Sequence, residues 1–88
     1  MFLYRVKVEE LDAARLLSLK NDIVRSENEL RGYCPIREMS VISGTAAREL
    51  DIYLALDDVI EPDQLKRLAG DINAMIDAER VSSELIHI

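Results

Sequence analysis

The segment 49–56 constrains the fold most strongly, because apolar side chains alternate along it without a break. It reads ELDIYLAL, and its apolar face consists of Leu50, Ile52, Leu54 and Leu56. A period of two is typical of a strand that buries one face. A helix would place Asp51 on the same side as Leu50 and Leu54, which fits the pattern worse. The sequence therefore predicts a strand here, with a core on one side of a sheet.

Three further segments carry strand patterns of decreasing clarity. Residues 2–8 alternate an apolar set with a mostly basic set, and the apolar set is Phe2, Tyr4, Val6 and Val8. Residues 37–43 predict a weaker strand, with Met39 and Val41 on one face. Residues 81–88 are mixed on both faces, so their register stays open. A mixed strand of this kind is expected at a sheet edge or against a partner.

Helical spacing appears in two segments. Over residues 9–31, apolar residues recur every three, four or seven positions, at Ala13, Leu16, Leu17, Ile23, Val24 and Leu30. Acidic residues occupy the expected first turn, where the helix dipole favours them, at Glu9, Glu10 and Asp12. Asn21 and Ser26 are candidate interruptions, and Gly32 is the expected left-handed cap.

The second helical segment begins at Pro62, with Glu61 as its candidate cap. Its apolar stripe consists of Leu65, Leu68, Ala69, Ile72 and Ile76. Gly70 lies inside this helix, where it costs about 1 kcal/mol against alanine. We expect a compensating reason for Gly70, namely close packing of the helix on the sheet.

The element order is strand–helix–strand–strand–helix–strand within one domain, residues 1–88. Gly44 and Thr45 mark a short link between the two middle strands, which favours an antiparallel hairpin. This α+β order resembles the ferredoxin-like superfold over the whole chain. The resemblance implies a four-stranded antiparallel sheet with two helices on one face. Many unrelated functions use this fold, so it fixes little about activity.

Charge and composition exclude several function classes. The net charge is −6 and the pI about 4.7, so phosphate backbones and anionic lipids repel the chain. We therefore expect neither a nucleic-acid nor a membrane partner. The single cysteine, Cys34, rules out an intrachain disulfide and a CxxC site. No secretory leader or run of about 20 apolar residues is present, so we expect a cytoplasmic protein.

The densest charge cluster is acidic and surrounds the start of the second helix. Its members are Asp57, Asp58, Glu61 and Asp63. Carboxylates are the ligands that Ca²⁺ and Mg²⁺ prefer, so the cluster is a candidate metal site. The spacing of an EF-hand loop is absent, however. We favour a different interpretation, in which these carboxylates bind no metal and are stabilised by the helix dipole at the start of the second helix.

Few residues offer other chemistry, and we expect no cofactor. His87 is the only histidine, and a Ser–His or Cys–His pair would need Ser82, Ser83 or Cys34 beside it. Cys34 follows a helix, where the dipole opposes a reactive thiolate, so we expect a buried structural cysteine. His87, Cys34 and Tyr53 are the titratable candidates for an active site formed between subunits.

The outer face of the sheet is the most informative surface. It is expected to carry Arg5, Lys7 and Asp51 together with the apolar contact candidates Leu3, Ile42 and Tyr53. Sheet-type RNA readers need two or three aromatic residues on such a face, and this chain has one. Our main hypothesis is a small non-catalytic accessory or regulatory domain that binds a second copy of itself or another protein. The alternatives are a small-ligand or divalent-cation binding domain and an enzyme with a site between subunits.

Overall fold

The computed structural model describes residues 1–44 and 48–88, and Thr45 of the expected turn lies outside them. The strands are β1 (Phe2–Glu9), β2 (Ile36–Gly44), β3 (Glu49–Leu56) and β4 (Arg80–His87); the helices are α1 (Ala13–Arg25), α2 (Glu27–Arg31) and α3 (Pro62–Met75). The strands form one sheet in the order β2-β3-β1-β4, with every neighbouring pair antiparallel. The predicted ferredoxin-like α+β fold is confirmed.

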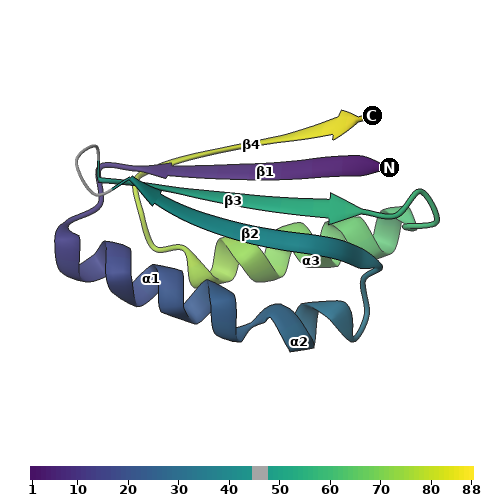
Figure 1. Cartoon of the computed structure of the whole chain (residues 1–88), viewed down its shortest axis with the longest axis horizontal. Helices are drawn as coiled ribbons and strands as arrows, with labels where there is room; N and C mark the ends of the chain where they lie inside the picture. Colours follow the sequence, from purple (N-terminus) through teal and green to yellow (C-terminus); the bar gives the residue numbers. More distant parts are fainter. Residues whose placement is uncertain (45–47) are drawn as a thin grey trace.

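The molecule has two layers, as Figure 1 shows. The helices of residues 1–44 and 48–88 all lie below the sheet, and none of them covers its upper face. The alternating residues of β3 point into the core, where Leu50, Ile52, Leu54 and Leu56 are fully buried. Val6 and Val8 of β1 join them, with Leu68 and Ile72 of α3. Both chain ends lie at the same end of the sheet, where Ile88 N–H donates to Met1 O at 2.8 Å.

The first helical segment departs from the prediction at its start and at its end. β1 continues to Glu9, and α1 begins only at Ala13, because Asp12 caps it by accepting from Arg15 N–H at 2.7 Å. The helix is interrupted at Ser26, one of the two candidate positions, and α2 follows. Gly32 keeps a right-handed conformation with φ of −63°, so the expected left-handed cap is wrong.

The buried stripe of α1 is also rotated from the expected one. Its buried residues are Leu16, Leu19 and Ile23. Leu17 and Val24, which we expected in the core, are exposed. Both the expected and the observed buried residues have helical spacing. The orientation of α1 against the sheet decides which of them are buried.

α3 begins at Pro62 as predicted, but the close packing predicted at Gly70 is not found. Pro62 occupies the first turn, and the backbone N–H of Glu61 donates to the side chain of Gln64 at 2.8 Å. A side chain at Gly70 would meet nothing within 4 Å, so the close helix–sheet packing expected there is wrong. Within the described residues, no helix is long and apolar enough to cross a bilayer.

Candidate functional site

The bare sheet face is built by the outward residues of all four strands. The strand register aligns Leu3 with Ala55 and Ile86, and Ala55 with Glu38 of β2, so this row near the chain termini is apolar except for Glu38. The next row aligns Arg5 with Tyr53 and Glu84. We call these outward residues of β1–β4 the open face. The opposite end of this face is charged, because Glu9 lies opposite Arg80 there and Glu49 lies opposite Gly44.

The basic residues Arg5 and Lys7 of the open face are paired with acidic ones, but the face as a whole is acidic, because Glu38 and Asp51 also point outward. Arg5 lies 2.7 Å from Glu84, and Lys7 Nζ lies 3.6 Å from a carboxylate oxygen of Glu9 and 3.6 Å from one of Glu49. Pairs this exposed contribute about 0–1 kcal/mol each. Their larger effect is to neutralise the basic residues, so the open face offers no strong anion site.

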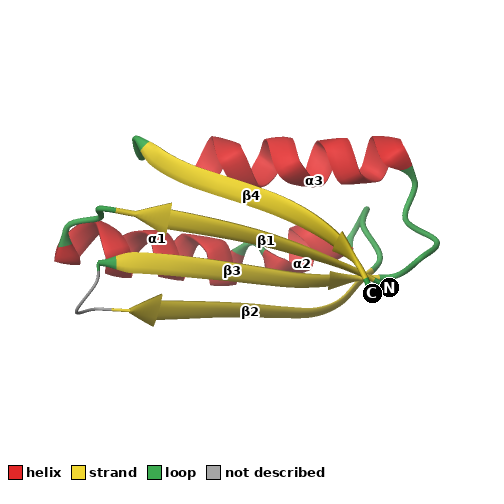
Figure 2. Ribbon diagram, turned by 90° about the horizontal axis from the view of Figure 1, so that it is seen from above, coloured by secondary structure: helices red, strands yellow, loops and turns green. Residues whose placement is uncertain are grey.

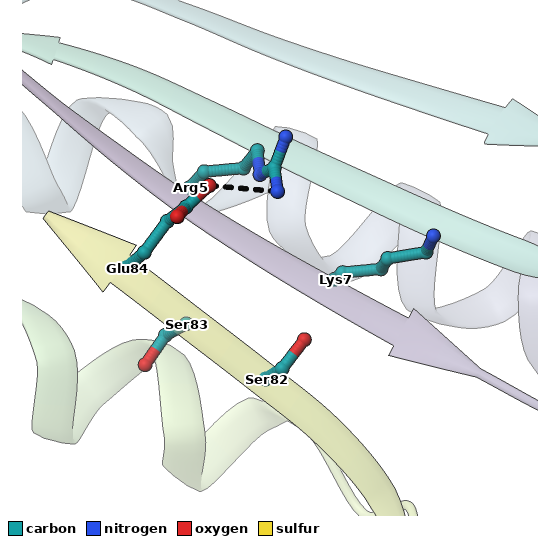
Figure 3. A pocket seen from close by; sticks show the side chains of 5 residues that line it. All are labelled: Arg5, Lys7, Ser82, Ser83 and Glu84. Atoms are coloured by element: carbon teal, nitrogen blue, oxygen red, sulfur yellow. Dashed lines mark ion pairs between the residues drawn. The ribbon is translucent and has the colours of Figure 1, made fainter. Parts of the chain in front are cut away.

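A shallow hollow on the open face is shown in Figure 3. Arg5, Lys7 and Ser82 point to the same side of the sheet, and the dashed line marks the pair of Arg5 with Glu84. Ser83 points to the other side, toward the helix layer. The groups that line the hollow can exchange hydrogen bonds with polar side chains, which suits contact with a protein surface.

The structure brings the three expected contact residues onto this one face. Leu3 and Tyr53 belong to adjacent rows on neighbouring strands, and both are half-buried. Ile42 lies across from Asp51 near the β2 edge, with 55% of its surface exposed. The placement agrees with the sequence, and their role in an interface stays a prediction.

The acidic cluster is divided among separate partners. Asp57 accepts a backbone hydrogen bond from Val59 and lies 3.1 Å from Arg37, and these contacts hold its pKa below the ordinary value. Asp58 pairs with the N-terminal ammonium, which lowers its pKa. Among the described residues, no three potential ligand side chains gather closely enough to hold a metal ion, and a cation site at Asp57, Asp58, Glu61 and Asp63 stays a prediction.

His87 and Cys34 occupy different surroundings. His87 is an exposed residue of β4, 3.5 Å from Asp58, and its ring packs against Phe2 with centroids 4.6 Å apart. Cys34 is buried just before β2, as expected of a structural cysteine, and burial raises the pKa of its thiol. β2 and β4 are opposite edges of the sheet, so the fold of one copy gives these two residues no shared site.

A polar cluster that joins α3 to the segment after α2 was not predicted from the sequence. Tyr33 Oη donates to Asp71 at 2.6 Å, and the guanidinium of Arg67 lies 3.9 Å from the centre of the Tyr33 ring. Burial, and then the hydrogen bond to Asp71, raise the pKa of Tyr33, so its hydroxyl stays protonated. The cluster borders a hollow between α2 and α3, where its groups satisfy one another. These contacts hold Tyr33 against α3, and each polar group of the cluster already has a partner within it.

Comparison with known proteins identifies the fold class but no family. No protein-family model matches the chain, and no curated protein matches it in sequence. Solved structures match its fold. A Deinococcus radiodurans protein described as a "putative antibiotic biosynthesis monooxygenase" has a TM-score of 0.67 and 9% identity, over 100% of this chain and 92% of that one.

Two further structures give the same picture. A protein from Mycobacterium tuberculosis has a TM-score of 0.65 and 10% identity, over 100% of this chain and 95% of that one. An uncharacterized NIPSNAP domain protein from Burkholderia xenovorans has a TM-score of 0.61 and 17% identity, over 100% and 94%. At these identities the likeness shows the fold alone, which several functional classes share.

Proposed function

We propose that the chain is a small accessory or regulatory domain that acts by self-association through the open face. The observation that carries this proposal is a sheet that helices cover on one face, while its other face bears the apolar residues Leu3, Tyr53 and Ile42 among charged residues of which Arg5 and Lys7 are paired. Apolar and aromatic side chains within polar surroundings are typical of protein–protein contact.

The size of the open face is consistent with a homodimer. Four strands spaced about 4.8 Å apart and about eight residues long at 3.3 Å per residue span about 500 Å². Two such faces give about 1,000 Å², which is the lower bound for a specific interface. The true accessible area is larger, because side chains roughen the surface. A second copy therefore supplies enough surface without any other chain.

The test is molar mass by light scattering over a concentration series, with Tyr53→Asp and a matched control. Val59→Asp places the same charge on a side chain that is 72% exposed in the turn before α3, away from the open face. We expect Tyr53→Asp to weaken dimerisation at least tenfold, since about 1.4 kcal/mol suffices for that factor. Val59→Asp should leave dimerisation unchanged. A wild-type monomer at every concentration, or equal effects of the two substitutions, would refute the proposal.

The likeness to a protein described as a monooxygenase favours an enzyme as the second candidate. In a single copy, the buried side chains of the described residues are apolar except for Tyr4 and Cys34. We place such an active site between subunits, where exposed groups such as His87 of two copies meet. A small-molecule screen by thermal shift separates the candidates: an enzyme of this kind predicts ligand stabilisation that Tyr53→Asp abolishes by dissociating the subunits.

A further inference from the structure

The two central strands of the sheet differ in charge on the open face. Figure 2 looks onto this face and shows β1 and β3 side by side in the middle of the sheet. The outward residues at the middle of β1 are Arg5 and Lys7, and both point to the same side of the sheet in Figure 3. Their register neighbours at the middle of β3 are Tyr53 and Asp51. The centre of the open face therefore has a basic half on β1 and an acidic and aromatic half on β3.

The direction of the symmetry axis decides which halves meet when two open faces pack together. Such copies are related by a two-fold axis in the plane of the interface. An axis across the strands lays β1 on the partner's β1, so the basic residues Arg5 and Lys7 meet basic residues. An axis along β1 opposes Lys7 to the partner's Lys7, and an axis along β3 opposes Asp51 to the partner's Asp51. A diagonal axis through the centre of the face opposes either Lys7 or Arg5 to its own copy. Juxtaposed like charges oppose association, so all these arrangements are disfavoured.

We propose that the second copy binds with its two-fold axis parallel to the strands and midway between β1 and β3, and that Lys7 and Asp51 are the residues that select it. This inference rests on the proposed self-association and specifies how the open face recognises its partner. The axis lays β1 on the partner's β3, with Lys7 over the partner's Asp51. Because Lys7 and Asp51 are also cross-strand neighbours within each copy, the four side chains form a ring in which basic and acidic groups alternate.

The same axis places Arg5 over the partner's Tyr53, where a guanidinium and an aromatic ring attract each other. It also gives the largest overlap of the two faces, because the strand order β2-β3-β1-β4 puts the midline of the sheet between β3 and β1. Packed sheets lie about 10 Å apart, a gap that a lysine and an aspartate side chain span together.

The twist of the sheets leaves the central contacts in place. Aligned sheets cross at about 30°, and a rotation of that size moves the middle of each strand least. The rows of Arg5 and Lys7 therefore stay over the partner's β3. The end row, in which Glu9 would face the partner's Glu49, is displaced sideways. The open face is acidic as a whole, so association depends on the two central rows, where the basic residues meet acidic or aromatic ones.

Charge exchange between Lys7 and Asp51 tests this recognition by light scattering. We expect Lys7→Glu and Asp51→Lys each to weaken self-association at least tenfold, because each substitution opposes like charges twice in a dimer. An equimolar mixture of the two variants should regain the mass of a dimer, since every new charge then faces an opposite one. Lys66→Glu in α3 and Asp22→Lys in α1 are matched controls, because they make the same exchanges at exposed positions of the helix layer.

The combined variant Lys7→Glu/Asp51→Lys decides the proposal even where a single variant does not fold, because it keeps an opposite pair within each copy. It should associate with itself and exclude the wild type, measured by retention of an untagged copy on a column that binds a tagged one. Free mixing with the wild type, or no recovery of dimers when the single variants are mixed, overturns the proposed axis. Failure of the proposed function is distinct, because the wild type is then a monomer or Tyr53→Asp has no more effect than Val59→Asp.

Discussion

Two leucines of α1 offer the sharpest test of how the helix layer is packed. Leu19 is 0% exposed and Leu17 is 63% exposed, although both belong to the same helix. We expect Leu19→Ala to destabilise the fold strongly and Leu17→Ala to leave it nearly unchanged. The comparison cancels helix propensity, because the same exchange is made twice in one helix. It isolates burial as the cause.

The magnitude follows from the atoms removed. Leucine to alanine deletes three carbons, and about 0.8 kcal/mol per buried CH₂ gives about 2.4 kcal/mol. A residual cavity raises such losses to about 2.7–5 kcal/mol. For a domain of this size, 3 kcal/mol corresponds to a Tm lower by about 12–24 °C. The exposed exchange at Leu17 should stay within about 0.5 kcal/mol.

Urea unfolding followed by far-UV circular dichroism measures both variants. Protein concentration must be held constant, because self-association would couple to stability. Equal losses for Leu17→Ala and Leu19→Ala would refute the packing described for α1. A larger loss of stability for Leu17→Ala than for Leu19→Ala would support the buried stripe that the sequence predicted, which includes Leu17.

Two further predictions concern the helix cap and the chain end. Asp12→Ala should lower the free energy of unfolding by about 1 kcal/mol, because it removes the hydrogen-bond acceptor at the start of α1. Asp12→Asn keeps a capping side chain and serves as the control. Equal melting temperatures of the two variants would count against the cap. The N-terminal ammonium, with a smaller contribution from His87, holds the pKa of Asp58 below its ordinary 3.8, so this carboxylate stabilises the fold above that pH and the contribution disappears as pH falls. Thermal melts should therefore show Asp58→Asn less stable than the wild type at neutral pH and equal to it in acid, and a gap independent of pH would contradict this.

The sheet was predictable because alternation is a local signal. The strand over 49–56 has the predicted bounds, since one of its faces is continuously apolar. β1 ends one residue later than predicted. β2 begins one residue earlier and ends one residue later than predicted. The mixed pattern of 81–88 indicated an edge strand, and β4 lies at the edge of the sheet.

The helix layer was less predictable because its packing depends on distant residues. Leu16 and Ile23 belong to both the expected stripe and the buried one, and only the angle of α1 against the sheet excludes Leu17 in favour of Leu19. The contact of Tyr33 with Asp71 spans 38 positions. No local pattern announces a pair of that kind.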